Sequence, residues 1–529
     1  MGGVANRLGS NHVKKRVLIF GIDGGTFNVI EPLLEAGRLP NLARFKAEGA
    51  AGVLYTVCPP LTAPAWATFQ TGLNPGRHGV FDFLAPPGRG YHRRLQNASA
   101  LRAARIFDTL SSADRTVGAV NVPLTFPPRA VNGFVVPGML TPKFADEFLY
   151  PPTLGAEMRA VGDYFVDMDP AYFEEVAEED FLRELRRVEG ARKRVALYLW
   201  ESKRPDLFAV VFTGVDRLMH FYWDRPELVR EHYEWLDGTL GEFLEAGDAD
   251  VTAMVVSDHG FGPAEREVDL AGHLVRRGFM TLHQKKGPSP RRFMDAVARL
   301  DAFDLRKRLP RRWRAAARGR IMERLSVFAA VDWSRTKAFP GTATQYGVYL
   351  NVAGREREGI VGRADYEKVR EDLIASLDEL HPGLAARALR REEVYHGPFL
   401  DDAPDVYLPL WEDGVRLREF SDDPAVAPRR RRPGEHRREG ILFARGPAIS
   451  AGATPADANL ADVYPTATYL MGEAVPAGLD GRVLTEIVKP ELLAAAPPSY
   501  FDYDVGDVGY VDGEDAAVRA RLQGMGYLG

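Results

Sequence analysis

Short apolar runs recur along this chain, and several of them end at an acidic residue. Residues 16–22 and 251–256 are each long enough for one buried strand, and Asp23 and Asp258 stand where these runs stop. Segments with the periodicity of amphipathic helices separate the runs. Alternating strands and helices predict an α/β fold with a mostly parallel central sheet and helices on both faces. Ligand sites in such sheets lie at the carboxyl ends of the strands, where both aspartates are expected.

The size and composition of the chain exclude few classes of protein. Its 529 residues are enough for several domains or for one large α/β enzyme with insertions. A formal net charge of −5 indicates no class of partner, and the single cysteine, Cys58, excludes an internal disulfide. The N-terminal residues lack the apolar run of a signal peptide, and no segment is apolar enough to span a membrane. We therefore expect a cytoplasmic protein.

Residues 58–72 are expected to hold the reactive group. Pro64 suits the first turn of a helix and Gly72 the position just past its end, so Thr62 is expected immediately before a short helix. A helix N-terminus offers free N–H groups and a positive dipole end, which would hold an anionic phosphoryl group over the Thr62 hydroxyl. We predict that Thr62 is a nucleophile. The alternative is an ordinary threonine at the start of a helix, where this residue type is common.

Acidic residues and histidines elsewhere form a set suited to divalent metal ions. Asp216 and His220 follow the strand predicted at 207–212 and are four residues apart, so a helix would place both on one face. A surface ion pair is the alternative reading of such a pair. The full set of candidate ligands is Asp23, Thr62, Asp216, His220, Asp258, His259 and His436.

Two divalent ions would use the whole set. Asp216, His220 and His436 would bind one ion, and the other four residues, including the Thr62 oxygen, would bind the second. Three carboxylates and one alkoxide would balance the charge of two ions, so the buried site would be neutral. One ion would lower the pKa of the Thr62 hydroxyl, the other would stabilise the leaving oxygen, and a phosphothreonine would form. Three imidazoles favour zinc, with manganese as the alternative.

The alternation of strand and helix lapses between residues 263 and 335. Residues 291–324 hold twelve basic and four acidic residues, so we expect a basic helical cap inserted into the core. The catalytic core is expected at 15–262 and 336–490, and a C-terminal tail at 491–529 is expected on the surface. The cap is either a solvated face or a surface for an anionic substrate, a membrane headgroup or nucleic acid. No nucleic-acid-binding motif supports the last alternative.

The motifs resemble, in chain order, those of the alkaline phosphatase superfamily. They are Asp23-Gly, Thr62-Ala-Pro, Thr71-Gly, His78-Gly, Asp216 with His220, Ser257-Asp-His-Gly and Gly434-Glu-His. The match covers most of residues 15–490 and is similar to the type I phosphodiesterase and nucleotide pyrophosphatase branch, especially its prokaryotic phosphohydrolase- and phosphomutase-like members. The resemblance implies an alkaline phosphatase-like sandwich, two zinc-like ions and a threonine nucleophile. It also implies a phosphorylated small molecule or a nucleotide as substrate.

Two positions depart from the patterns of the superfamily. The resemblance implies an asparagine donor three residues after the nucleophile, where this chain has Ala65. A backbone N–H near Ala63 and the side chains of Arg437 and Arg438 are the candidates to bind the substrate in its place. Cys58 with two following prolines resembles the sulfatase motif, but the arginine that this motif needs is absent.

Three functions stay open on the sequence. The first is a metal-dependent phosphodiesterase, and the second is a phosphomonoesterase or phosphomutase with the same ligands. The third, of another class, is a non-catalytic protein that binds anionic lipid or nucleic acid through the basic cap.

Overall fold

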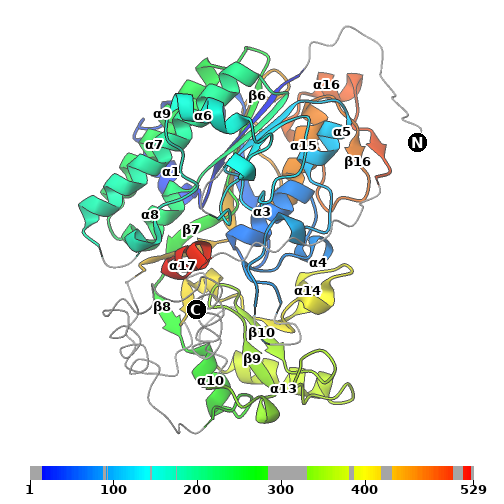
Figure 1. Cartoon of the computed structure of the whole chain (residues 1–529). Helices are drawn as coiled ribbons and strands as arrows, with labels where there is room; N and C mark the ends of the chain where they lie inside the picture. The colour runs from blue at the N-terminus through cyan, green and yellow to red at the C-terminus, as the bar shows by residue number, and fades with distance from the viewer. Residues whose placement is uncertain are drawn as a thin grey trace.

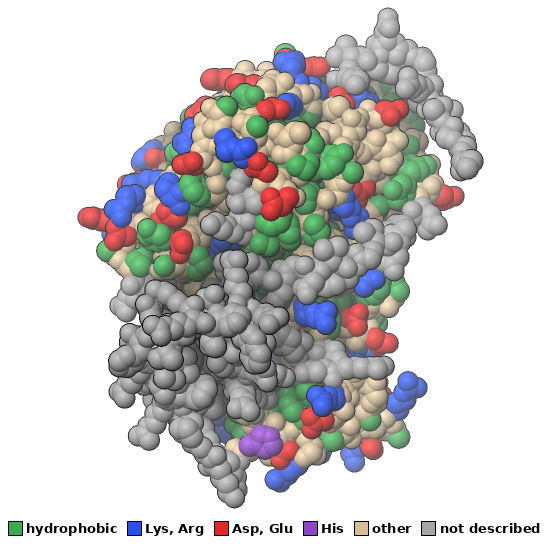
Figure 2. All heavy atoms as spheres, in the orientation of Figure 1, with side chains coloured by type: hydrophobic (Ala, Val, Ile, Leu, Met, Phe, Trp, Pro, Cys, Tyr) green, Lys and Arg blue, Asp and Glu red, His purple; other side chains and the backbone are tan. Residues whose placement is uncertain are grey.

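The structure is a computed structural model. It describes residues 15–86, 91, 93–142, 146–173, 176–283, 330–380, 387–418, 432–503 and 516–525. Most of the predicted basic cap, residues 284–329, lies outside the described residues. In the described part of the chain, no helix has the length and apolar character that crossing a bilayer requires. On the face shown in Figure 2, acidic and basic side chains are interspersed rather than gathered by sign.

A seven-stranded sheet forms the centre of the molecule. Its strands, in spatial order, are β2 (Ala50–Tyr55), β15 (Glu439–Arg445), β6 (Thr252–Val256), β1 (Val17–Ile22), β5 (Leu207–Phe212), β3 (Val117–Val120) and β4 (Gly133–Val136). Only β15 runs antiparallel to its two neighbours. Every residue of β1 is buried, because parallel strands covered on both faces need continuous apolar sequence. The predicted mostly parallel sheet is confirmed.

Helices cover both faces of this sheet (Figure 1). Leu18 and Phe20 of β1 face one apolar core, whereas Val17 and Ile19 face the other, as the two-residue period of a strand requires. The helices that pack mainly in the first core are α1 (Phe27–Glu35), α2 (Pro40–Glu48), α6 (Leu154–Val161), α7 (Glu178–Lys203), α8 (Gly214–Tyr222), α9 (Pro226–Glu245) and α17 (Ala516–Gly524), and α3 (Thr62–Thr71) contributes Ala63 and Ala67. The helices of the second are α3 (Thr62–Thr71), α5 (Ile106–Ser112), α15 (Val463–Leu470) and α16 (Pro490–Ala495).

A smaller antiparallel sheet lies below the central one in Figure 1. Its strands, in spatial order, are β11 (Leu389–Arg390), β12 (Val406–Tyr407), β10 (Gly347–Leu350) and β9 (Ala338–Pro340). The helices beside it are α10 (Leu270–Arg276), α13 (Tyr366–Asp378) and α14 (Arg391–Val394). Strands were expected at 347–352 and 405–410, but they pair with each other rather than with the central sheet. The predicted boundaries of core and cap stay a prediction.

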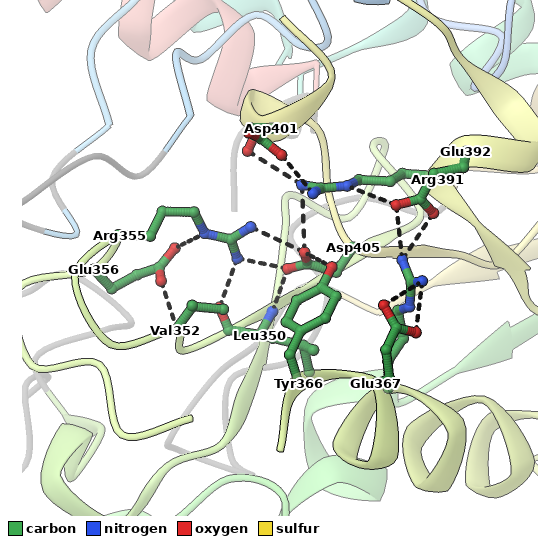
Figure 3. A network of polar contacts seen from close by, with 11 residues as sticks. Leu350, Val352, Arg355, Glu356, Tyr366, Glu367, Arg391, Glu392, Asp401 and Asp405 are labelled. Carbon is green, nitrogen blue, oxygen red and sulfur yellow. Dashed lines mark hydrogen bonds and ion pairs between the residues drawn. The ribbon is translucent and has the colours of Figure 1, made fainter. Parts of the chain in front are cut away.

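A buried carboxylate ties the smaller sheet to its helices (Figure 3). Asp405, which has no exposed surface, accepts hydrogen bonds from Tyr366 Oη at 2.6 Å and from Leu350 N at 2.7 Å. Arg355 approaches the same carboxylate with Nη1 at 2.9 Å and Nη2 at 2.6 Å. A bidentate arginine contact of this kind is among the stronger polar interactions. The network therefore holds β10, β12 and α13 in one arrangement.

The end of the chain does not lie wholly on the surface, so that expectation is wrong. Tyr500 is 60 % exposed, but α17 (Ala516–Gly524) buries Val518 and Leu522, and Met525 follows them into the first core. These three side chains recur at the spacing of one helix face. In Figure 1, α17 is drawn between the two sheets, and it contacts the 3₁₀ turn at Pro170–Phe173. A further short strand, β7, spans Gly260–Pro263. The remaining described strands are β8 (Arg266–Val268), β13 (Val415–Leu417), β14 (Gly434–Arg437), β16 (Val475–Pro476) and β17 (Tyr500–Phe501).

Candidate metal centre

The carboxyl ends of β1, β5 and β6 bring five of the candidate side chains together. Because these strands are parallel neighbours, their ends meet at one edge of the sheet. The helix α8 begins two residues after β5 and carries two of the candidates on one face, as the four-residue spacing predicted. The five residues are Asp23 after β1, Asp216 and His220 on α8, and Asp258 and His259 after β6.

The other two candidates arrive from distant parts of the chain. β14 pairs antiparallel with β7 and places His436 opposite Phe261, two residues from His259. Thr62 is the first residue of α3, so the helix begins at the threonine itself and not just after it. All seven side chains are buried; His436, the most exposed, keeps 2 % of its surface. The structure therefore brings the whole predicted set to one place.

The first group of ligands surrounds Asp216. Its Oδ1 lies 3.4 Å from His220 Nε2 and 3.2 Å from His436 Nε2. The two imidazole nitrogens are only 3.0 Å apart. Two nitrogen lone pairs at this separation repel each other unless a proton or a cation lies between them. The group is thus suited to a positive ion.

The second group surrounds His259. Its Nε2 lies 3.3 Å from Asp258 Oδ2, 3.6 Å from Asp23 Oδ1 and 3.4 Å from Thr62 Oγ1. Ligand atoms of Asp23, Asp258 and His259 lie within 4.8 Å of one another, and so do those of Asp216, His259 and His436. His259 therefore belongs to both groups, whereas the sequence prediction gave it to one. Such sharing brings the two groups close together.

Backbone carbonyl groups fix the orientation of two imidazoles. His436 Nδ1 donates to Pro60 O at 2.6 Å, and His259 Nδ1 donates to Gly260 O at 3.1 Å. With the proton held on Nδ1, the Nε2 lone pair of each ring faces the centre. This is the arrangement that histidine ligands of metals commonly adopt.

Two carboxyl groups of the centre lack the partners that buried carboxylates need. Within the described residues, both oxygens of Asp23 and Oδ2 of Asp258 have no hydrogen-bond partner. Burial and the neighbouring Asp258 and Asp216 raise the pKa of Asp23 well above its usual value. Burial raises the pKa of Asp258 to about 7, although Gly24 N–H donates to its Oδ1. Cations would replace these protons and satisfy the oxygens, so the residues present fit metal ions.

Asp216 behaves differently from the other two carboxylates. Burial alone would raise its pKa, but His220, His436 and Arg217 outweigh burial and hold the pKa well below its usual value. Arg217 is 1 % exposed and follows Asp216 directly on α8. We did not single out this arginine from the sequence. A charged residue among Val215, Leu218 and Met219 is the signal that could have found it.

The candidates for substrate binding differ in their surroundings. Ala63 lies in the first turn of α3, where backbone N–H groups have no partner within the helix. Arg437 donates to the carbonyl oxygens of His436 (2.9 Å) and Pro263. The side chain of Arg438 is 41 % exposed, and its Nη1 lies 3.8 Å from Glu412. Arg437 thus donates to backbone carbonyl groups, whereas Arg438 is partly exposed and pairs with Glu412.

Ala65 and His78, on or just after α3, lie in structural surroundings away from the centre. Ala65 is fully buried in the second core beside Trp66, so an asparagine there would bury its amide among apolar side chains. His78 accepts from Val80 N at 3.2 Å and contacts Thr68 Oγ1 at 3.0 Å. Burial lowers the pKa of His78 to about 3, so this imidazole is a neutral part of the fold. It is not among the residues that gather at the centre.

A model of one protein family matches residues 17–437 of this chain, and its description is type I phosphodiesterase / nucleotide pyrophosphatase. The chain belongs to this family. It has the alkaline phosphatase-like α/β fold that the motifs implied. As a member, it is a metal-dependent phosphohydrolase of the phosphodiesterase type. No curated protein matches it in sequence.

Solved structures of family members share the fold. Human ectonucleotide pyrophosphatase/phosphodiesterase 5 superimposes with a TM-score of 0.52 at 14 % identity, covering 90 % of this chain and 100 % of its own. The murine protein, solved as an inactive threonine-to-alanine variant in complex with AMP, gives the same values. At this identity the likeness shows the fold alone.

Proposed function

We propose that the chain hydrolyses phosphodiesters at a two-metal centre, with Thr62 as the nucleophile. The observation that carries the proposal is the position of the Thr62 hydroxyl, 3.4 Å from His259 Nε2, the atom that contacts Asp23 and Asp258 as well. Thr62 is fully buried, and the carboxyl groups of Asp23 and Asp258 near it have oxygens without hydrogen-bond partners in the described structure, which supports this role.

Two ions would divide the ligands according to these contacts. Asp216, His220 and His436 would hold one, and Asp23, Asp258 and Thr62 the other, with His259 beside both. Three imidazoles favour zinc over magnesium, with manganese second. When bound, the ions supply positive charge that lowers the pKa of a coordinated hydroxyl and stabilises a leaving oxygen.

The chain's own residues would perform a double displacement. Thr62 Oγ1 loses its proton and forms a bond to phosphorus while the bond to the leaving oxygen breaks; that oxygen takes up a proton and departs as the alcohol, which leaves a phosphothreonine ester. Backbone N–H groups of the first turn of α3, near Ala63, face the anionic phosphoryl group and favour it through the helix dipole. Water then cleaves the threonine ester, releases the monoester product and restores the hydroxyl of Thr62.

A nucleotide-like diester is the proposed substrate class. The family description names nucleotide pyrophosphatases, and the murine relative was solved with AMP. A phosphomonoesterase or phosphomutase with the same ligands is the second candidate. The predicted basic cap, its contact with anionic membranes and the cytoplasmic location stay predictions.

The proposed reaction is tested with a panel of three substrates. Zinc-loaded protein should cleave a nitrophenyl nucleotide diester and bis-nitrophenyl phosphate faster than nitrophenyl phosphate, with the difference expressed in kcat/KM. A preference for the monoester would favour the second candidate. Turnover of none of the three by protein that contains two zinc ions would contradict the phosphodiesterase proposal.

Arg438→Gln is expected to raise KM for a diester about tenfold and to change kcat little, because a charged hydrogen bond to the bound anion is lost. The carbonyl oxygen of Arg438 accepts a hydrogen bond from Thr56 N, and the positive charge of Arg438 partly opposes the rise that burial causes in the pKa of Cys58. Arg438 therefore lies beside the segment that leads to Thr62. Steady-state kinetics of the zinc enzyme measure both constants. Arg437→Gln is the matched control, since that guanidinium already binds carbonyl groups; an equal rise in KM for both variants would contradict the assignment.

A further inference from the structure

The carboxylate of Asp216 presents only one oxygen to the metal centre. Its Oδ1 faces His220 and His436, as described above. Its Oδ2 instead accepts a hydrogen bond from Arg217 Nη1 at 2.5 Å. A carboxylate held in this way by its neighbour cannot rotate freely about its own axis, so its orientation toward a metal ion is set by the arginine.

Arg217 is in turn held by a second carboxylate. Its Nη2 donates to Asp167 Oδ2 at 3.0 Å, and both side chains are at most 2 % exposed. Asp167 Oδ1 accepts from Met168 N at 2.8 Å, which fixes the carboxylate on its own backbone. The guanidinium of Arg217 therefore bridges two buried carboxylates from separate parts of the chain. Asp167 balances the charge of the arginine, so the negative charge of Asp216 remains for a metal ion.

The segment around Asp167 is clamped from two sides. Arg192 of α7 donates to Val166 O at 2.8 Å, and Arg521 of α17 donates to Met168 O at 3.2 Å. The helix α17 also contacts the 3₁₀ turn at Pro170–Phe173, which follows directly. The C-terminal helix thus connects to the metal ligand Asp216 through the backbone of Met168 and two charged side chains, Asp167 and Arg217.

We propose that Arg217, anchored by Asp167, is a positioning residue that makes Asp216 a one-oxygen ligand and sets the affinity of one of the two metal ions. The inference rests on the proposed function only in assuming that metal ions bind to this centre. A positioning role for Arg217 differs from a purely structural role in what it predicts. Loss of Arg217 should weaken the binding of the ion held by Asp216, His220 and His436, and it should not weaken the binding of the ion beside Asp23.

The test measures zinc binding directly. Purified full-length protein is stripped of metal, and zinc stoichiometry and affinity are determined by native mass spectrometry and by competition with a chelating dye. Wild type should bind two ions. Arg217→Met should weaken one of them 10- to 100-fold and leave the other unchanged, as loss of a residue that orients a metal ligand usually does. Asp167→Asn should weaken the same ion by a smaller factor.

Two further variants keep the test decisive. Arg217→Lys retains one positive donor and should recover part of the affinity, and it serves if Arg217→Met fails to fold. Arg105→Met is the matched control, because Arg105 has no exposed side-chain surface and pairs with Asp108 at 2.6 Å outside the centre. This control should lower the melting temperature without changing either zinc affinity.

The inference is overturned if Arg217→Met and Asp167→Asn both bind the two ions with wild-type affinity. If Arg217→Met does not fold, the same result for Arg217→Lys and Asp167→Asn overturns it. Equal weakening of both ions in these variants would overturn it as well, since that pattern reflects general loss of structure. Failure of the proposed function is distinguishable: the wild type would then bind two zinc ions and cleave no diester. Wild type that binds no zinc would refute both.

Discussion

Thr62→Ala is expected to lower kcat/KM for bis-nitrophenyl phosphate by about 10⁴-fold or more. The substitution removes the only atom that forms a bond to phosphorus in the proposed first step, and loss of an enzyme nucleophile commonly has an effect of this size. The hydroxyl of Thr62 contacts His259 Nε2 at 3.4 Å, inside the centre. The rate is measured with zinc-saturated protein, and zinc content is measured alongside.

Thr71→Ala is the control for this variant. Thr71 lies on the same helix, is fully buried and donates to Ala67 O at 2.8 Å, but it is not part of the centre. Its rate should stay within a few-fold of wild type. A Thr62→Ala enzyme that keeps a tenth or more of the wild-type rate would show that another group attacks phosphorus.

Asp23→Asn is expected to lower activity by about 10³-fold or more through loss of bound zinc, yet to make the zinc-free protein more stable above neutral pH. Both carboxylate oxygens lack a hydrogen-bond partner in the described structure, and burial together with Asp258 and Asp216 raises the pKa of Asp23. A group with a raised pKa in the folded state contributes stability that is present below its unfolded pKa of about 3.8 and lost as pH rises through the folded pKa. The asparagine side chain of the Asp23→Asn variant does not ionise, so the variant avoids this loss of stability.

The measurement is thermal unfolding between pH 5 and pH 9, with a chelator and with zinc. With the chelator, Asp23→Asn should melt above wild type at pH 8 to 9 and depend less on pH; with zinc, wild type should melt higher. Asp108→Asn is the control, because Arg105 (2.6 Å) and Arg129 (3.1 Å) pair with this carboxylate outside the centre and, against the effect of burial, hold its pKa below its usual value. It should lose stability under both conditions. A lower melting temperature of Asp23→Asn with the chelator at pH 8 would contradict this account.

The central sheet could be predicted from sequence because its inner strands have a strong local signal. β1, β5 and β6 are continuous apolar runs, and parallel strands deliver their carboxyl ends to one edge whatever the details of packing. This is why Asp23, Asp216 and Asp258 could be grouped before their distances were known. Helical spacing likewise placed Asp216 and His220 on one face of α8.

Features that depend on pairing between distant segments could not be predicted from the sequence. The strands β10 and β12 have the same apolar pattern as strands of the central sheet, and nothing local specifies that they pair with each other. The sharing of His259 follows from the register of β14 on β7, which joins segments about 170 residues apart. The role of Arg217 depends on Asp167, which lies 50 residues away along the chain.

The most direct test of the central claim is the stereochemical course at phosphorus. A nitrophenyl nucleotide diester made chiral with sulfur would be hydrolysed by the zinc-loaded wild type in ¹⁸O-water, and the configuration of the product determined. Attack by Thr62 followed by attack by water inverts phosphorus twice, so the account predicts net retention. Net inversion would show that water attacks the substrate directly and that no phosphothreonine forms.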